Sequence, residues 1–252
     1  MLEGLAALAA QAEALGLDLL VVPERLAAAG GVPAALPACA AAAAATARIR
    51  IASGLLALPL HHPLRVAEDA ATLDALSGGR FELGVGLGAE VEAFAGFGLD
   101  LHARALRFEE ALEVMGRAWA DGPVRFAGRH FRIDGTEVHP KPVQAGGPPL
   151  WLGARSSDAL ARAARLGVGA VVEPDTDPAP YLEAWRALGR ELGDARVAFL
   201  IDSSSAEGGV LRARLARCRG ARLDAWVAAP RGAADLPELC DAAAGLRALE
   251  PP

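Results

Sequence analysis

IRIASGLLALPLHHPLRVAEDAATLDALSGGRFELGVGLG, residues 49–88, contains one complete strand–helix–strand unit. The apolar run Ile49–Leu58 predicts a strand that is buried on both faces. Pro63 suits the first turn of a helix, where its missing N–H is not needed, and the Ser77–Gly79 segment ends that helix. Phe81–Gly88 then alternates apolar residues with glycine or Glu82, which predicts a second strand.

The second strand carries three glycines, Gly84, Gly86 and Gly88, toward its far end. Glycine weakens the interior of a strand, so its repeated use there indicates that something bulky approaches the backbone. A large, flat ligand is one explanation. A tightly packed corner of a barrel is the alternative.

The same unit recurs along the chain. Helices are expected at residues 2–16, 34–47, 63–77, 103–119, 158–166, 180–192, 206–219 and 234–249, and strands at 17–22, 49–58, 81–88, 150–153, 168–173, 196–202 and 223–228. Strands that alternate with helices in this way form parallel sheets with right-handed crossovers. A small hairpin is expected as an insertion at about residues 122–134.

Seven strands are one fewer than the closed eight-stranded barrel needs, and the chain opens on a helix where a first strand is expected. We therefore predict a TIM (β/α)8-type barrel that lacks its first strand, as a single domain over residues 1–252. Either the true start lies upstream, or the barrel closes without that strand. An open doubly wound sheet is disfavoured, because no G-x-G-x-x-G motif opens a helix after the first strand.

The composition argues against several classes of partner and site. The chain has 252 residues, 53% of them hydrophobic, and a net charge of −6, which argues against nucleic acid or an anionic membrane as partner. Its three cysteines are far apart and lack metal-binding spacing, as is usual in a reduced, cytoplasmic protein. The alanine-rich run Ala38–Ala45 is too short to span a bilayer. A soluble cytoplasmic protein without a metal site is expected.

Three stretches, the first of them within the segment quoted above, carry a resemblance to a known family. They are HHPLRVAEDAATLDALSGGRFELGVGLG at 61–88, RFEEALEVMGRAWADGPVRFAGRHFRI at 107–133 and PKPVQAGGPPLWLGARSSDALARAARLG at 140–167. Together they resemble the bacterial luciferase-like family of flavin- or deazaflavin-dependent oxidoreductases, over roughly residues 5–172. The resemblance implies FMN or coenzyme F420 over the carboxyl ends of the strands. It also implies reduction or monooxygenation of a small organic substrate, a homodimer, and a separate flavin reductase or F420 reductant.

The resemblance also assigns cofactor-binding residues. Ser53, Gly54 and Leu55 match a strand end at which family members carry a non-proline cis peptide behind the isoalloxazine; an ordinary buried strand is the alternative. Gly84, Gly86 and Gly88 match a strand on which the cofactor lies against main chain.

The turn Gly153, Ala154, Arg155 and Ser156 combines free N–H groups at a helix start with an arginine, as a phosphate site requires. The alternative is that Ser157 caps the helix and Arg155 points into solvent.

The acid–base assignment rests on fewer residues. Family members often carry a histidine after the strand that aligns with Leu17–Val22, and this chain has Glu24 and Arg25 there. Glu24 is the candidate catalytic base if it is buried near the ring, whereas in a solvated loop it would have no such role. His61 and His62 precede a helix, where structural or capping roles are the default. The alternative function is therefore a non-catalytic flavin-binding relative or a pseudoenzyme that has lost its active-site histidine.

The predicted helix 103–119 carries Leu106, Met115 and Trp119. These residues suit a dimer interface, and packing into the protein's own core explains them equally.

Overall fold

A computed structural model of the chain describes residues 4–26, 32–173, 175–201 and 222–228. The helices predicted at 206–219 and 234–249 lie outside the described residues. The other predicted elements are present, with ends that shift by a few residues.

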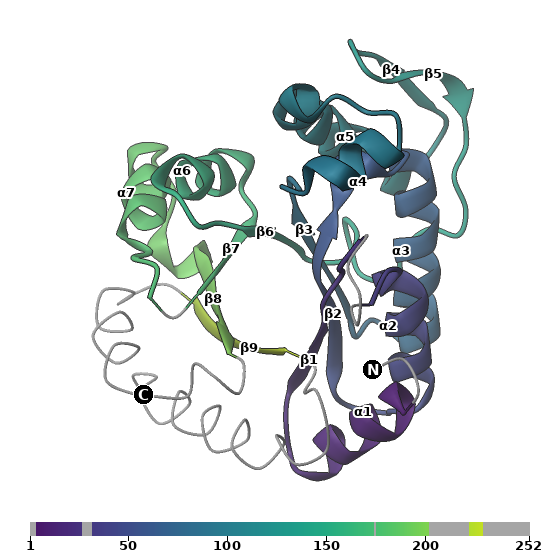
Figure 1. The fold of residues 1–252 in the computed structure, drawn as a ribbon, viewed down its shortest axis with the longest axis vertical. Helices are drawn as coiled ribbons and strands as arrows, with labels where there is room; N and C mark the ends of the chain where they lie inside the picture. Colours follow the sequence, from purple (N-terminus) through teal and green to yellow (C-terminus); the bar gives the residue numbers. More distant parts are fainter. Residues whose placement is uncertain (1–3, 27–31, 174, 202–221, 229–252) are drawn as a thin grey trace.

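Seven parallel strands form a closed barrel in the described part of the chain (Figure 1). In order around the ring they are β1 (Leu19–Val22), β2 (Arg50–Ala57), β3 (Phe81–Gly86), β6 (Leu150–Gly153), β7 (Gly169–Val172), β8 (Arg196–Ile201) and β9 (Arg222–Ala228). The ring closes where β1 pairs directly with β9, with Leu20 opposite Val227. The predicted TIM-type barrel is confirmed, and these seven strands close it without an eighth between β9 and β1.

Helices cover the outside of the barrel. They are α1 (Leu5–Ala14), α2 (Ala35–Ala44), α3 (Pro63–Ser77), α5 (Arg104–Trp119), α6 (Ser157–Leu166) and α7 (Ala179–Ala187). In Figure 1, α1 to α3 flank β1 to β3, and α6 and α7 lie on the opposite side of the ring. Short segments complete the series: α4 (Val91–Gly96) and the 3-10 turns η1 (Leu58–Leu60), η2 (Leu101–Ala103) and η3 (Leu192–Asp194). No helix in these ranges is both long and apolar enough to cross a bilayer.

Helix α3 begins and ends where its sequence signals place it. Pro63 is its first residue, and Gly78 ends it in the left-handed conformation, with φ of 65°. Only glycine adopts that φ without a steric cost, so the Ser77–Gly79 signal is explained.

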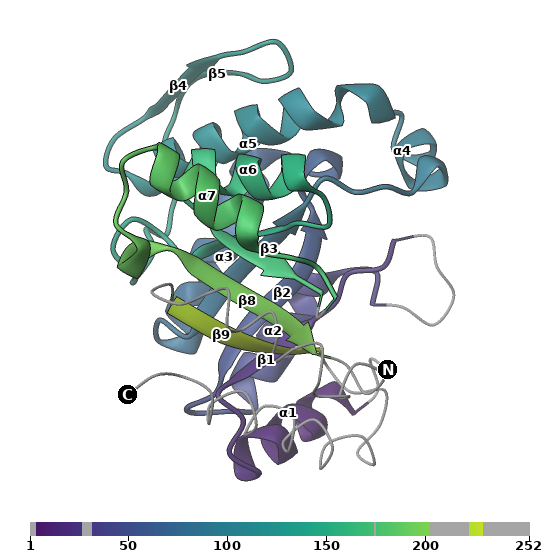
Figure 2. The same cartoon turned by 90° about the vertical axis from the view of Figure 1, so that its left-hand side faces the viewer.

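The predicted hairpin is β4 (Val124–Ala127) with β5 (Arg132–Thr136), and it projects beyond α5 in Figures 1 and 2. Glu110 of α5 holds its turn: the carboxylate accepts hydrogen bonds from the backbone N–H groups of Arg129 and His130, both at 2.8 Å, and of Phe131 at 3.2 Å.

Helix α5 packs into the core. The side chain of Met115 is fully buried and that of Trp119 is 7% exposed, with its indole N–H donating to the carbonyl of Ala67 at 3.1 Å. Leu106 alone of the three proposed interface residues is exposed, at 43%. Met115 and Trp119 are thus core residues, and the interface explanation is wrong for them, because helical spacing places them on the face toward α3.

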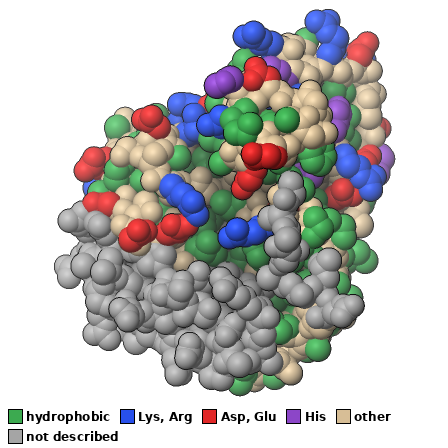
Figure 3. Space-filling model, viewed as in Figure 1, with side chains coloured by type: hydrophobic (Ala, Val, Ile, Leu, Met, Phe, Trp, Pro, Cys, Tyr) green, Lys and Arg blue, Asp and Glu red, His purple; other side chains and the backbone are tan. Residues whose placement is uncertain are grey.

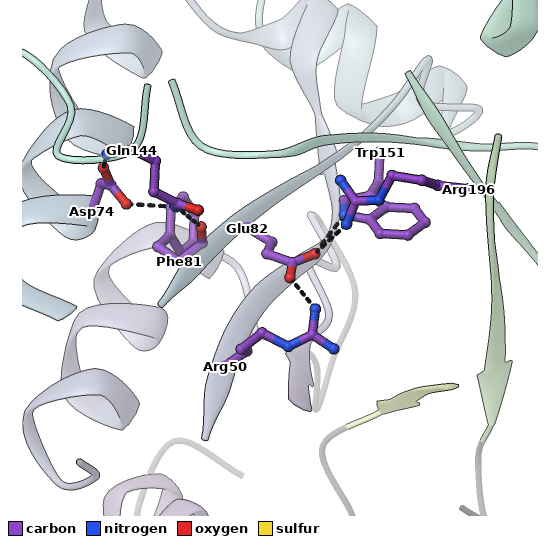
Figure 4. Close-up of polar contacts among 7 residues, drawn as sticks. All are labelled: Arg50, Asp74, Phe81, Glu82, Gln144, Trp151 and Arg196. Atoms are coloured by element: carbon purple, nitrogen blue, oxygen red, sulfur yellow. Dashed lines mark hydrogen bonds and ion pairs between the residues drawn. The ribbon is translucent and has the colours of Figure 1, made fainter. Parts of the chain in front are cut away.

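A buried ionic cluster lies inside the barrel near the amino ends of its strands (Figure 4). The Glu82 carboxylate pairs with Arg50, accepts the indole N–H of Trp151 at 2.5 Å, and lies 3.8 Å from the Arg196 guanidinium. The Arg196 guanidinium stacks 4.2 Å from the Trp151 ring. Four strands, β2, β3, β6 and β8, therefore meet at one carboxylate.

Candidate site at the carboxyl ends of the strands

All the predicted site residues lie at one mouth of the barrel. Residues 54, 55, 84, 86 and 153 stand in the carboxyl halves of β2, β3 and β6, and Ser53 lies at the middle of β2. Glu24, Gly88 and residues 154–156 lie in the segments that follow these strands or β1. Because parallel strands end on the same side, the fold brings these residues together. In Figure 2, β8 and β9 point toward the side on which α4 lies.

The end of β2 has the irregular backbone that the resemblance implies. The Gly54–Leu55 peptide bond is cis, and the pairing of β2 with β3 shifts register between Ser53 and Leu56. The Ser53 hydroxyl is buried and donates to the carbonyl of Gly84 at 2.9 Å, which fixes the turn against β3. The cis peptide is confirmed; the cofactor-binding role of Ser53, Gly54 and Leu55 stays a prediction.

The glycines at the mouth accommodate side chains of the protein itself. A Cβ at Gly153 would lie 1.9 Å from Leu55 Cδ1, and one at Gly86 would lie 3.5 Å from Leu55 Cβ. A Cβ at Gly88, whose φ is 69°, would lie 3.1 Å from Cε2 of the Phe94 ring. Leu55 thus fills the space beside Gly153 and Phe94 the space beside Gly88, which favours the tightly packed barrel corner at these two positions, and the approach of a flat ligand stays a prediction. The binding roles assigned to Gly84, Gly86, Gly88 and Gly153 remain predictions.

The β6–α6 turn carries the predicted phosphate-binding residues. The Ala154 N–H donates to the carbonyl of Val171 at 2.9 Å, which ties the turn to β7. Ser156, and not Ser157, caps α6: its hydroxyl accepts the N–H of Ala159 at 3.3 Å. The Arg155 side chain is 80% exposed and forms an ion pair with Glu173. An anion bound here would compete with Glu173 for Arg155, and the phosphate site remains a prediction.

Glu24 is a buried carboxylate. Its side chain is 2% exposed, and its Oε2 accepts the backbone N–H of Ala57 at 2.8 Å, just after the cis peptide. Its Oε1 lies 3.7 Å from Nε2 of His61. The solvated-loop alternative is therefore wrong for Glu24, whereas Arg25 is exposed. The role of Glu24 as a catalytic base stays a prediction.

Sequence reasoning missed the pairing of His61 with Glu24, because the two residues belong to different loops. The Nε2 atom of His61 is buried without a hydrogen-bond partner among the described residues. No spacing in the sequence relates the two residues, and only the packing of the β1 and β2 loops brings them together.

His62 has a structural environment, in line with its default explanation. Its ring packs edge-on against Phe131 of the hairpin, with 5.6 Å between centroids. Burial, and then the Arg107 charge, hold the pKa of His62 below its usual value, so the ring is neutral at pH 7.

The space-filling view in Figure 3 shows hydrophobic side chains mixed with acidic and basic ones over the described part of this face. Charges of both signs lie side by side. The coloured part of this view therefore shows no broad patch of a single sign, the kind of surface that steers nucleic acid to a protein.

Comparison with known proteins identifies relatives with the same architecture. The family model described as luciferase-like monooxygenase matches residues 2–207. The crystal structure of the monooxygenase RslO1 from Streptomyces bottropensis aligns over 96% of this chain and 90% of its own, with a TM-score of 0.76 and 22% identity. The oxygenating constituent of 3,6-diketocamphane monooxygenase from Pseudomonas putida, solved with FMN, aligns over 82% of this chain and 64% of its own, with a TM-score of 0.68 and 22% identity.

Among curated sequences, F420-dependent glucose-6-phosphate dehydrogenase from Beutenbergia cavernae is 34% identical over 166 residues, which are 63% of this chain and 48% of that protein. The chain spans half or less of the length of the first curated relatives it matches. The family model nevertheless covers most of the chain, in the region that contains β1 to β8. The chain therefore belongs to the luciferase-like monooxygenase family.

Proposed function

We propose that this chain is an oxidoreductase that binds FMN or coenzyme F420 at the barrel mouth and acts on a small organic substrate. The observation that carries the proposal is the position of the Leu55 side chain, which lies over Gly86 and Gly153 at the carboxyl ends of three strands. Relatives with this fold include an FMN complex and an F420-dependent dehydrogenase.

The residues at the mouth fit such a cofactor. Leu55 is partly buried against the interior cluster that contains Trp151, so it offers an apolar surface on which a tricyclic ring can lie. Arg155 and the start of α6 follow β6, the strand that ends at Gly153, where an arginine and backbone N–H groups suit a phosphate.

When bound, a flavin or deazaflavin supplies two-electron chemistry at its ring. The protein's own part is to hold and orient it. Leu55 excludes water from one face of the ring, Arg155 leaves Glu173 to bind the phosphate, and Ser53 holds the cis turn in place through Gly84. The buried Glu24 secures Ala57 and thereby the segment that carries Leu55.

Two partners follow from the same proposal. A monooxygenase of this kind needs a source of reduced cofactor, which a separate flavin reductase or F420 reductant would supply. We also propose a homodimer in the cytoplasm, and size-exclusion chromatography with light scattering tests the oligomeric state.

A second candidate function is a flavin-binding relative without turnover. The observation that favours it is the state of Glu24, which is 2% exposed and already accepts the Ala57 N–H. A carboxylate held in this way is less available as a base. A pseudoenzyme would also lack turnover, and it differs from this second candidate because it would not bind the cofactor.

The test is a titration of the purified chain with FMN and, separately, with F420, followed by cofactor absorbance and tryptophan fluorescence. We expect saturable binding of one of them. Arg155→Ala should weaken it about tenfold or more, because a charge-assisted hydrogen bond is worth about 1.5–3 kcal/mol. Adding Ser156→Ala should weaken it further through loss of the helix cap.

Arg125→Ala is the matched control. This arginine of the hairpin is 70% exposed and pairs with Asp134, and neither residue belongs to the candidate site. Its binding should equal that of the wild type. Failure of both cofactors to bind the folded protein would overturn the proposal and leave the pseudoenzyme, whereas binding without turnover on any substrate would favour the second candidate.

A further inference from the structure

We propose that Glu24 and His61 form an acid–base pair in which Glu24 holds the proton of the imidazole on Nε2, so that Nδ1 of His61 is a proton acceptor at the barrel mouth. The existence of the pair is argued from geometry alone. Its part in a reaction rests on the proposed function. His61 then has the proton-handling role, and Glu24 is a positioning residue.

The first observation is the burial of the two facing atoms. The Glu24 side chain is 2% exposed, and Nε2 of His61 is buried without a hydrogen-bond partner in the described residues. A buried polar atom without a partner is costly, about 1–3 kcal/mol, so a neighbouring acceptor decides its protonation state. The acceptor at hand is Glu24 Oε1, 3.7 Å away, which a small side-chain rotation brings into hydrogen-bond range.

The second observation is that Glu24 cannot easily turn away. Its other oxygen accepts the Ala57 N–H at 2.8 Å, and this bond aims Oε1 at His61. A carboxylate accepts hydrogen bonds and does not donate them, so Nε2 must carry the proton of a neutral His61. The Nδ1 atom is then left with its lone pair. Carboxylate–histidine pairs use this logic to fix the tautomer of a working histidine.

The third observation is access. The His61 side chain is 31% exposed although Nε2 is buried, so the open part of the ring is its other side. A proton taken up at Nδ1 would convert the ring to imidazolium, and the Glu24 carboxylate would balance that charge. The pair lies in the segments that follow β1 and β2, and β2 is the strand that carries Leu55.

The other charged and titratable groups around the pair come from three elements. Cys39 of α2 is fully buried. Burial, and then the Glu24 charge, raise the pKa of its thiol, so the thiol is neutral and places no charge beside Glu24. Arg107 of α5 donates to the carbonyl of Pro59 at 2.7 Å, and His62 faces Phe131. Arg25 in the β1 loop is exposed. Among these described neighbours, Glu24 is the acceptor that faces Nε2.

The test is the tautomer of His61, read from the 15N shifts of both ring nitrogens in long-range 1H–15N spectra. The spectra are recorded on the apo protein at an alkaline pH at which the nitrogen shifts themselves report a neutral ring. We expect the wild type to carry the proton on Nε2. In Glu24→Gln the single amide oxygen remains with Ala57 and the NH2 group faces His61, so the proton should move to Nδ1.

The matched control is Glu137→Gln. Glu137 and His139 form the same kind of pair, 3.5 Å apart, but their side chains are 51% and 67% exposed, so water competes and the substitution should not invert the His139 tautomer. A wild-type His61 protonated on Nδ1, or one whose tautomer is the same in the folded Glu24→Gln variant, would overturn the proposal. A wild-type spectrum with the proton on Nδ1 would overturn the proposal even if that variant does not fold.

A second measurement places His61 in the site. Diethyl pyrocarbonate acylates a neutral, accessible imidazole nitrogen, and mass spectrometry locates the product. We expect His61 to react in the apo protein and to be protected at least severalfold by whichever cofactor binds, whereas His139 should react equally in both states. Unchanged reactivity of His61 in a protein that binds the cofactor would overturn its role at the mouth. Absence of cofactor binding would instead count against the proposed function, and the tautomer would still decide the pair.

Discussion

Gly169 opens β7 directly beside the indole ring of Trp151. A Cβ at this position would lie 2.3 Å from Trp151 Cε3, far inside van der Waals contact. The ring has no room to move, because its N–H donates to Glu82 and the Arg196 guanidinium lies 4.2 Å from it. The glycine is thus required by packing inside the barrel.

We therefore predict that Gly169→Ala lowers the free energy of unfolding by about 1–3 kcal/mol, the usual cost of overpacking a core. Urea denaturation followed by far-UV circular dichroism measures it. The control is Gly116→Ala in the interior of α5, where a Cβ meets nothing within 4 Å. That change should stabilise the protein by about 0.5–1 kcal/mol, since alanine loses less backbone entropy in a helix. Equal effects of the two substitutions would contradict the packing argument.

At the scale of elements, one carboxylate joins α5 to the hairpin of β4 and β5. Burial by itself would raise the pKa of Glu110, but the backbone N–H groups of His130, Arg129 and Phe131 outweigh it, and the pKa lies below its ordinary value. The same carboxylate explains Gly128, because a Cβ there would lie 2.5 Å from Glu110 Oε2. The hairpin turn is therefore shaped around Glu110.

A lowered pKa in the folded state means that the ionised carboxylate contributes stability above its ordinary pKa and that this contribution is lost as the pH falls through the folded value. We predict that Glu110→Gln speeds hydrogen exchange at the amides of residues 129–131 at neutral pH. The difference from wild type should shrink in acid, once wild-type Glu110 is itself protonated. Glu113→Gln, an exposed change on the same helix, should leave these amides unchanged; a similar effect from it would refute the assignment.

At the scale of the whole molecule, the barrel joins strands that are far apart in the chain. β1 pairs with β9, and Glu82 on β3 contacts side chains from β2, β6 and β8 (Figure 4). The cluster lies near the amino ends of the strands and the candidate site at their carboxyl ends. The ionic cluster and the candidate site are thus separated along the barrel axis, as stability and binding usually are in this architecture.

We predict that Glu82→Gln destabilises the folded protein by about 1–3 kcal/mol, because an amide cannot balance Arg50 and Arg196 and leaves buried polar atoms poorly paired. Thermal unfolding followed by tryptophan fluorescence measures the loss, with cofactor affinity of the folded variant expected to stay within about twofold. Glu68→Gln, which removes an exposed ion pair on α3, should cost less than about 0.5 kcal/mol. A Glu82 variant as stable as this control would contradict the account.

The sequence by itself determined the order of the elements, because the period of its apolar residues, Pro63 and Gly78 act within one helix or strand. The family resemblance, rather than a local rule, pointed to the end of β2 as part of the candidate site, whereas the helix start and the arginine of the β6–α6 turn predicted a phosphate site there. Local rules reached the elements and this turn because each depends on neighbours in the chain.

Only the tertiary structure decided which side chains meet. It places Leu55 over Gly86 and Gly153, buries Met115 and Trp119 of α5, closes the ring between β1 and β9, and brings His61 to Glu24. Each of these contacts joins segments from different strands or loops, and their distances follow from the curvature of the barrel and from packing. No periodicity within a single element encodes them.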